Sequence, residues 1–159
     1  MEKLIPLLIV IFSLLSCQKQ QFDLTDFEVH ENSKNNSKQL NLALQSIKKL
    51  CRNGQEIYIS LPKGTYHFYE KGTFLCEYYI SNHDQDNPKR VVFNFDEWEN
   101  LVFDGNGSKF IFHGRLLPFT LKNSKNCKLK NFSIDFENPH IAQVKIVENQ
   151  TEKGNVRSI

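Results

Sequence analysis

The sequence predicts an all-β fold with one N-terminal capping helix, in which short strands stack as the coils of a parallel solenoid. Short apolar segments alternate with polar turns from residue 78 onward, and one amphipathic segment precedes them. One strand-and-turn pattern also occurs twice. Thirteen Phe and five Tyr against one Met favour strands, because aromatic side chains fit pleated surfaces. A β-sandwich of regularly spaced strands is the alternative that the pattern leaves open.

Residues 1–16 are predicted to be a signal peptide and not part of the fold. The apolar run from Leu4 to Leu15 has the length of a signal-peptide core and is too short to span a bilayer. It ends in Leu-Leu-Ser-Cys17, which resembles the lipobox of bacterial lipoproteins, where the Cys is acylated. An ordinary signal peptide that contains a Cys is the alternative. We expect an exported lipoprotein with its membrane anchor on Cys17, in the periplasm or on the outer-membrane surface of a Gram-negative bacterium.

Residues 17–36 are predicted to contain the anchor, a short strand at 22–27 and a polar loop. A capping helix over 37–54 follows, with Asn36 or Ser37 as its N-cap and Asn53-Gly54 as its stop. Its apolar residues recur at steps of three and four, so they form one stripe that would cover the first coil. The stripe consists of Leu40, Ala43, Ile47, Leu50 and Cys51.

Residues 55–159 are predicted to form the first few coils. Ile57, Ile59 and Leu61 share one face at period two, and residues 62–66 turn the chain into another short strand. The strands expected after that point are 78–81, 91–96, 101–103, 109–112, 119–121, 129–130, 132–136 and 144–147.

The repeated pattern aligns residues 100–105 with residues 126–131, at a spacing of 26. In a parallel solenoid, equivalent residues of successive coils lie about 4.8 Å apart. Phe103 would then lie beneath Leu129 in the interior. Asp104 would lie beside Lys130 and form an exposed ion pair. Asn and Gly at the corners would supply left-handed backbone.

Charge and cysteine content limit the possible partners. The formal net charge is +2 with mixed signs, which does not suggest a nucleic-acid partner. Besides Cys17 the chain has Cys51, Cys76 and Cys127, so at most one disulfide is possible, between Cys51 and Cys76. Three unpaired, buried thiols are the favoured interpretation. The His and Cys residues show no metal-ligand spacing, so we expect no structural metal.

Two resemblances refine this interpretation. The order of strand, polar loop, helix and Pro62-x-Gly-x-Tyr66 resembles the N-terminal segment of pectate-lyase-like right-handed parallel β-helix proteins. Four shorter motifs resemble glycoside hydrolase family 110. They are Glu77–Asn82, Gly105–Ser108, Phe112–Gly114 and Ile134–Pro139.

The family resemblance implies an exo-acting α-1,3-galactosidase. Such an enzyme removes terminal α-1,3-linked galactose from glycans by inverting hydrolysis, without a cofactor. Family catalytic domains run to several hundred residues, so the resemblance implies catalytic carboxylates downstream of Ile159 and no activity for this chain alone. The expected partners are a glycan with terminal α-linked galactose and a membrane, and the oligomeric state stays open. Another β-helix lyase or hydrolase, or a surface-anchored glycan-binding module, is the alternative.

Asp135 and Glu137 are the first candidate substrate-binding residues, because they share the outward face of strand 132–136. Two positions along a strand advance about 6.6 Å, and an inverting glycosidase needs carboxyl groups about 6.5–9.5 Å apart. Solvation, or pairing with a Lys of a neighbouring coil, is the favoured alternative.

His113 and Trp98 are the other two candidates. His113 could donate a hydrogen bond to a sugar hydroxyl, or it could be a turn histidine satisfied by the backbone. The single Trp98, together with Tyr79, could stack on the apolar face of galactose. Alternatively, Trp98 folds back over the edge of the core.

Overall fold

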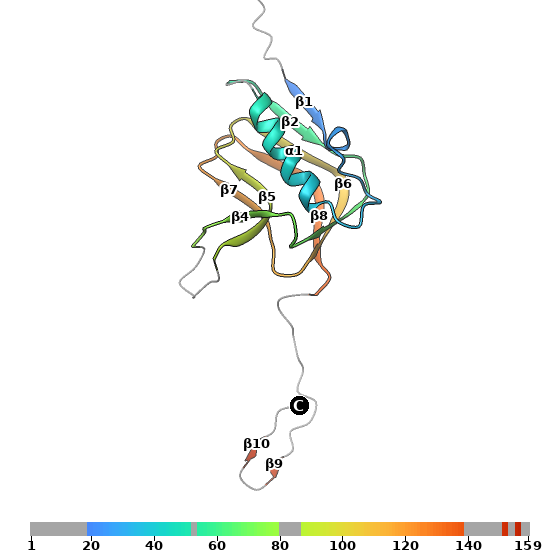
Figure 1. Cartoon of the computed structure of the whole chain (residues 1–159), viewed down its shortest axis with the longest axis vertical. Helices are drawn as coiled ribbons and strands as arrows, with labels where there is room; N and C mark the ends of the chain where they lie inside the picture. Colours follow the sequence, from blue (N-terminus) through green and yellow to red (C-terminus); the bar gives the residue numbers. More distant parts are fainter. Residues whose placement is uncertain (1–18, 52–53, 80–86, 139–150, 153–154, 157–159) are drawn as a thin grey trace, which may run out of the picture.

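The computed structural model describes residues 19–51, 54–79, 87–138, 151–152 and 155–156. The predicted signal peptide, the predicted lipid site Cys17 and the strand expected at 144–147 lie outside these residues. Helix α1 lies against a set of mainly parallel strands (Figure 1). Within the part of the chain that is described, no helix has the length and apolar character needed to cross a membrane.

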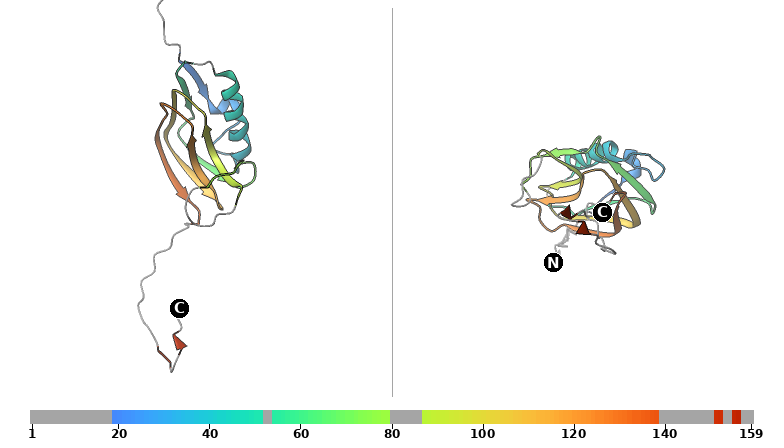
Figure 2. Two further views of the ribbon diagram at one scale, coloured as in Figure 1. Left: turned by 90° about the vertical axis from the view of Figure 1, so that its left-hand side faces the viewer. Right: turned by 90° about the horizontal axis from the view of Figure 1, so that it is seen from below.

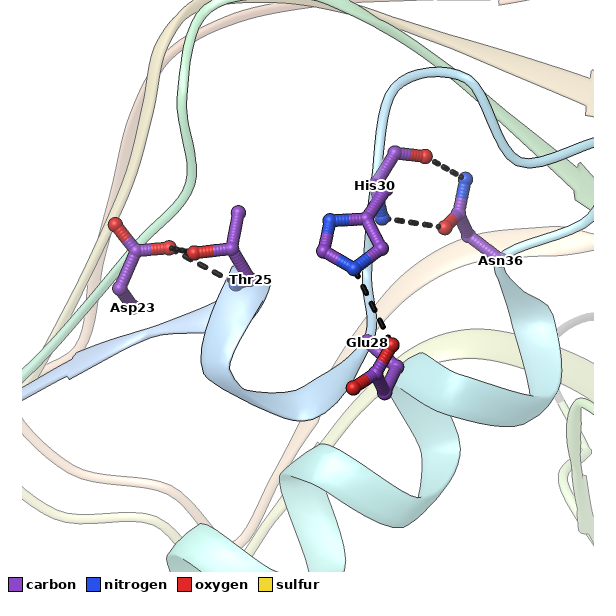
Figure 3. A network of polar contacts seen from close by, with 5 residues as sticks. All are labelled: Asp23, Thr25, Glu28, His30 and Asn36. Atoms are coloured by element: carbon purple, nitrogen blue, oxygen red, sulfur yellow. Dashed lines mark hydrogen bonds and ion pairs between the residues drawn. The ribbon is translucent and has the colours of Figure 1, made fainter.

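The chain begins with strand β1 (Gln20–Asp23) and a short 3-10 helix, η1 (Leu24–Phe27). The strand expected at 22–27 is therefore wrong beyond Asp23. The Asp23 carboxylate accepts hydrogen bonds from the Thr25 amide at 2.9 Å and the Thr25 hydroxyl at 2.7 Å. These bonds bend the chain out of the extended conformation (Figure 3).

Helix α1 (Ser37–Leu50) begins where the sequence predicts and ends four residues before the predicted end. Leu40, Ala43 and Ile47 are buried as expected, and so is Leu44, which the predicted stripe omits. Leu50 belongs to the predicted stripe but is 57% exposed, because the helix stops there and Cys51 is already extended.

Asn36 is the N-cap residue, but its side chain makes no capping bond. Its amide instead binds both the N–H and the C=O of His30, each at 3.0 Å (Figure 3). The Asn35 side chain accepts from the Ser37 amide at 2.9 Å. The polar loop before the helix is thus hydrogen-bonded to the start of the helix.

The larger sheet is parallel throughout. Strands β1, β2 (Ile57–Ser60) and β6 (Leu101–His113) lie in that order, and β6 also pairs with β3 (Thr65–Tyr69) and β8 (Lys128–Phe136). Strand β6 joins the two strands expected at 101–103 and 109–112, and β8 likewise joins 129–130 and 132–136.

The second sheet contains β4 (Phe74–Cys76), β5 (Lys89–Asp96) and β7 (Leu117–Lys122). β5 and β7 are parallel, whereas β4 is antiparallel to β5. The strand expected at 78–81 is wrong for its described residues, because Tyr78 and Tyr79 follow β4 and lie outside any strand. Figure 2 shows α1 along one side of the strands. Strands β9 (Thr151–Glu152) and β10 (Asn155–Val156) form an antiparallel pair.

The register of the parallel pairs confirms the repeat. Phe103 pairs with Leu129, and Asp104 pairs with Lys130, both at the predicted spacing of 26. Val91 of β5 pairs with Leu117 of β7 at the same spacing. The alternative of two facing antiparallel sheets does not describe this arrangement, because only one of the strand pairs within these two sheets is antiparallel.

The core between the sheets is aromatic. The buried ring of Phe93 stacks on Phe119 with centroids 4.4 Å apart, and Phe119 stacks on Phe132 at 5.0 Å. Leu121 and Ile134 point the same way as these rings, yet they are 48% and 45% exposed. They lie on β7 and β8, and no further strand among the described residues pairs with the outer edges of those two strands.

Asparagine dominates the corners, as predicted. Asn100 and Asn126 both have left-handed backbone, with φ of 54° and 53°, and the Asn126 amide donates to the Asn100 side chain at 2.7 Å. Asn131 is also left-handed, but its aligned partner Gly105 is not. In that coil Asn106 and Gly107 adopt positive φ instead.

The three described cysteines, Cys51, Cys76 and Cys127, are free, so the possible Cys51–Cys76 disulfide is not formed. Each is only half-buried. Burial nevertheless raises the pKa of the Cys51 thiol to about 11, which disfavours a reactive thiolate.

Candidate outward-facing polar site

Three polar side chains meet at one end of the larger sheet, on its outward face. His67 comes from β3, His113 is the last residue of β6, and Glu137 follows the end of β8. His67 Nδ1 lies 2.9 Å from His113 Nε2, and His113 Nδ1 lies 2.8 Å from Glu137 Oε2. The three groups therefore form one hydrogen-bonded chain across three strands.

His113 is the central member of this chain, and two hydrogen bonds and one stacked ring hold its side chain. It is 8% exposed, and the ring of Tyr69 stacks on it with centroids 4.0 Å apart and planes 2° from parallel. The expectation of a turn histidine satisfied by the backbone is wrong, because His113 still belongs to β6 and bonds to side chains. Its register partner in β3 is Tyr69, which explains the stacking.

This arrangement fixes the hydrogen-bonding roles of the two imidazoles. A hydrogen bond between two imidazole nitrogens needs one N–H and one lone pair, so one of the two facing nitrogens of His67 and His113 donates and the other accepts. The Glu137 carboxylate can only accept, so His113 Nδ1 is the donor of that bond. Among the described residues, no cluster of three or more His, Cys, Asp or Glu side chains has an arrangement suited to a metal ion.

Asp135 lies on the same outward face but has a different partner. Its carboxylate is 2.9 Å from the Lys109 ammonium, and both side chains are about half exposed. The hydrogen bond from Lys109, followed by the lysine's positive charge, lowers the pKa of Asp135 below its usual value. Pairing with a lysine of the neighbouring strand is the alternative stated for this residue. Asp135 and Glu137 therefore share a face without sharing a partner.

Asp104 forms the predicted ion pair with Lys130 at 2.8 Å. The pair was expected to be exposed, but the Asp104 side is buried, with 4% of the residue exposed. Its carboxylate also accepts from Tyr58 at 2.8 Å and from Asn131 at 3.0 Å. Burial raises the pKa of Asp104, but hydrogen bonds from Lys130, the Asn106 amide, Tyr58 and Asn131 outweigh it and hold the pKa well below its usual range. This cluster has a structural role, since the four groups that bind the Asp104 carboxylate all belong to the fold itself.

Trp98 is 3% exposed and packs edge-on against Phe95, with ring centroids 5.7 Å apart at 90°. The ring therefore folds back over the core, which is the stated alternative to stacking on a sugar. Tyr79 is 86% exposed.

Comparison with known proteins decides the family. No family model matches the chain. Alpha-1,3-galactosidase B of Bacteroides fragilis is 51% identical over 138 residues, which is 86% of this chain and 23% of that protein. Proteins of the same name from Phocaeicola vulgatus and Parabacteroides distasonis are 51% identical over 148 residues and 54% identical over 114 residues. The first of these matches covers 92% of this chain and 25% of the relative. The second covers 72% of this chain and 19% of the relative.

The chain matches the exo-α-1,3-galactosidase family. It spans about a quarter or less of the length of the curated relatives it matches. The resemblance stated from the sequence motifs is thereby confirmed.

The sequence motifs of this galactosidase homologue do not reveal His67 of the polar chain or Tyr69, which stacks on His113. Both alternate with the inward residues Tyr66 and Phe68, and that alternation is a signal that they face outward. Their position beside His113 depends on the pairing of β3 with β6, between residues 44 positions apart. No repeat in the sequence reveals that offset.

Proposed function

We propose that this chain is the first part of an exo-α-1,3-galactosidase that removes terminal α-1,3-linked galactose from glycans by inverting hydrolysis. The observation that carries the proposal is 51% identity, over 86% of the chain, with a protein named alpha-1,3-galactosidase B. Its partner is a glycan with terminal α-linked galactose.

The fold belonging to this proposal is the first coils of a right-handed parallel β-helix. Two features support it: the spacing of 26 between paired residues in both sheets and the continuous aromatic core. The half-exposed Leu121 and Ile134 point toward the position that the next coil would cover. A segment that follows in the longer protein would pair with the open edges of β7 and β8.

In this arrangement the chain provides the scaffold, and the catalytic carboxylates belong to later coils. The contacts of the acidic candidates support this division. Asp135 is bound to Lys109, and Glu137 is bound to His113. Inverting hydrolysis requires one free carboxylate to activate water and one protonated acid to meet the leaving group. The lowered pKa of Asp135 does not suit a general acid, and its ion pair with Lys109 leaves it unavailable as a general base.

The test is a segment exchange. The matched segment of Bacteroides fragilis alpha-1,3-galactosidase B is replaced by the corresponding part of this chain, and free galactose released from Galα1-3Gal is measured. We expect activity close to that of the unmodified enzyme and little release from Galα1-4Gal. Proton NMR of the first product should show β-galactose, as inversion requires. A soluble chimera that releases unsaturated uronides from acidic polysaccharides, and no galactose, would support a lyase instead.

We also propose export as a lipoprotein, with residues 1–16 removed and Cys17 acylated. Support comes from the apolar run that ends in Leu-Leu-Ser-Cys17. Growth with an alkyne-tagged fatty acid should label the protein, and the label should be lost in Cys17→Ser but kept in Cys51→Ser. Equal labelling of both variants would contradict the anchor.

A further inference from the structure

The fold begins very close in sequence to the proposed lipid anchor. Gln18 and Lys19 are the residues that separate Cys17 from Gln20, the first residue of β1. In any conformation, the chain from Cys17 to Gln20 spans at most about 11 Å. The headgroup layer on each side of a bilayer is itself about 5–8 Å thick. Acyl chains on Cys17 that enter the hydrocarbon would therefore hold the start of β1 at the membrane surface.

A ladder of backbone hydrogen bonds starts at the same point and crosses the larger sheet. The Gln20 amide donates to the Glu56 carbonyl at 2.8 Å. The Ile57 amide donates to the Asn100 carbonyl at 2.9 Å, and the Asn100 amide donates to the Lys125 carbonyl at 3.0 Å. Because the strands of this sheet are parallel, β1, β2, β6 and β8 all start along this ladder. Their starts therefore form one edge of the fold.

Helix α1 ends at the same edge. The Gln20 side chain donates to the Leu50 carbonyl at 3.3 Å, and the start of β1 lies beside the end of α1 (Figure 1). We call this edge the anchor corner. It comprises Gln20, the last turn of α1, Glu56 and residues 96–100 and 122–128.

The charges of the anchor corner suit phospholipid headgroups. Glu56 pairs with Lys19 at 3.6 Å, and Glu97 pairs with Lys48 at 3.9 Å. The remaining charged residues of the corner are four exposed lysines and two acids: Lys49, Lys122, Lys125, Lys128, Asp96 and Glu99. Four positive charges against two leave a positive surplus, which attracts anionic headgroups. Leu50, which is 57% exposed, adds an apolar side chain that fits the boundary between headgroups and hydrocarbon.

The other end of α1 lies far from the anchor corner. The Ser37 hydroxyl donates to the Tyr69 carbonyl at 2.7 Å, so the helix begins against the end of β3. The 14 residues of α1 span about 20 Å along the helix axis. Lys38, in the first turn, and Lys71, two residues after Tyr69, are both exposed at this distant end.

We propose that the anchor corner rests on the phospholipid headgroups of the membrane that carries the lipid on Cys17. The ladder from Gln20 to Lys125 then lies along the membrane surface, and β6 and β8 run away from it toward His113 and Glu137. The short tether sets the distance of the corner from the bilayer, and the lysines and Leu50 contact the lipid. This inference rests on the proposed acylation of Cys17 and not on the proposed galactosidase activity.

The test is lysine footprinting of the full-length protein. A water-soluble acetylating reagent is applied to the acylated wild type in isolated membranes and to the released Cys17→Ser protein, and mass spectrometry gives the rate at each lysine. We expect anchoring to slow acetylation of Lys49 and Lys125 severalfold and to leave Lys38 and Lys71 unchanged. Equal effects at all four lysines would overturn the proposal. Protection of Lys49 without Lys125 would also overturn it, because the ladder would then stand away from the membrane.

The fatty-acid label on Cys17 separates failure of the anchor from failure of the orientation. An unlabelled wild type would refute the anchor, and the orientation with it. A labelled wild type whose Lys49 and Lys125 react as fast as in Cys17→Ser would refute the orientation alone.

Lengthening the tether supplies a second measurement. An insert of about fifteen Gly and Ser residues between Gln18 and Lys19 has a root-mean-square length of about 20 Å, which frees the corner from the headgroups. We expect the insert to abolish the protection of Lys49 and Lys125 while the fatty-acid label is kept. Gln18→Asn, which leaves the tether length unchanged, is the matched control and should keep the protection. Equal protection with and without the insert would show that the short tether does not hold the corner in place.

Discussion

Phe103 lies directly beneath Leu129, because β6 and β8 run parallel and pair these two residues. The ring of Phe103 is fully buried and also approaches Phe93, with centroids 5.2 Å apart, and Phe132 at 5.9 Å. One residue of the interior therefore touches both sheets and links successive strands. Phe103 and Leu129 thus form one column of the interior.

Shortening an inward side chain of this column should lower the stability of the fold. Phe103→Ala should lower the free energy of unfolding by about 3–5 kcal/mol, because it removes a buried ring and leaves a cavity between two sheets. Urea unfolding measures the loss. The neighbouring Val102→Ala, on the outward face, should cost about 1 kcal/mol or less. Equal losses for the two variants would mean that the inward and outward faces are wrongly placed.

Gly105 should not tolerate a side chain. A Cβ at this position would lie 2.6 Å from Phe132 Cβ and 2.8 Å from the Asn131 carbonyl oxygen, so the two strands would have to separate. Gly105→Ala should cost about 1–3 kcal/mol, measured by thermal unfolding. Ser133→Ala on the exposed face of β8 serves as control and should leave Tm nearly unchanged.

The buried carboxylate of Asp104 should make stability depend on pH in the acidic range. Its pKa is lower in the folded chain than in the unfolded chain, so the folded state binds protons less readily. The contribution is complete above the unfolded-state pKa of about 3.9 and is lost as the pH falls toward the folded-state pKa. Urea titrations of the wild type and Asp104→Asn should differ at neutral pH and converge in acid. A constant difference would contradict the prediction.

Trp98 provides an optical check. Because the single Trp is buried against Phe95, its emission should be blue-shifted and resistant to iodide quenching. Galactose should not change the spectrum. A red-shifted, readily quenched emission that responds to galactose would restore Trp98 as a sugar-stacking residue.

Asp135 should be dispensable for catalysis in the chimera described above. Asp135→Asn breaks an exposed ion pair with Lys109, and such pairs contribute little in solution. We expect kcat/KM within about twofold of the unmodified chimera. A loss of several orders of magnitude would place Asp135 in the reaction.

The sequence shows the repeat, the helix start and the inward residues, because each depends on local periodicity. Phe103 over Leu129 follows from a spacing of 26 that is visible in one chain. The 3-10 helix after Asp23 could not be predicted, since it depends on two local bonds from Thr25 to the Asp23 carboxylate. Likewise, whether Trp98 faces solvent depends on packing between strands.

In the candidate site, too, local alternation predicts which side chains face outward, whereas the pairing of strands decides which of them meet. The outward position of Asp135 follows from alternation along a strand, but its lysine partner depends on register. His113 was a candidate, yet its neighbours His67 and Tyr69 come from a strand paired at an offset of 44. That offset depends on the length of the segment between β3 and β6, and no repeated motif in the sequence has this spacing.

The bend between Asp104 and Ser108 has a practical consequence. Asp104 pairs with Lys130 and Ser108 with Phe132, so β6 has two more residues at this point than β8. The flanking strands stay in register despite the difference. Peptide tags or reporter loops grafted between Asn106 and Gly107 would therefore extend a segment of β6 that has no register partner in β8, which offers a site for labelling the protein.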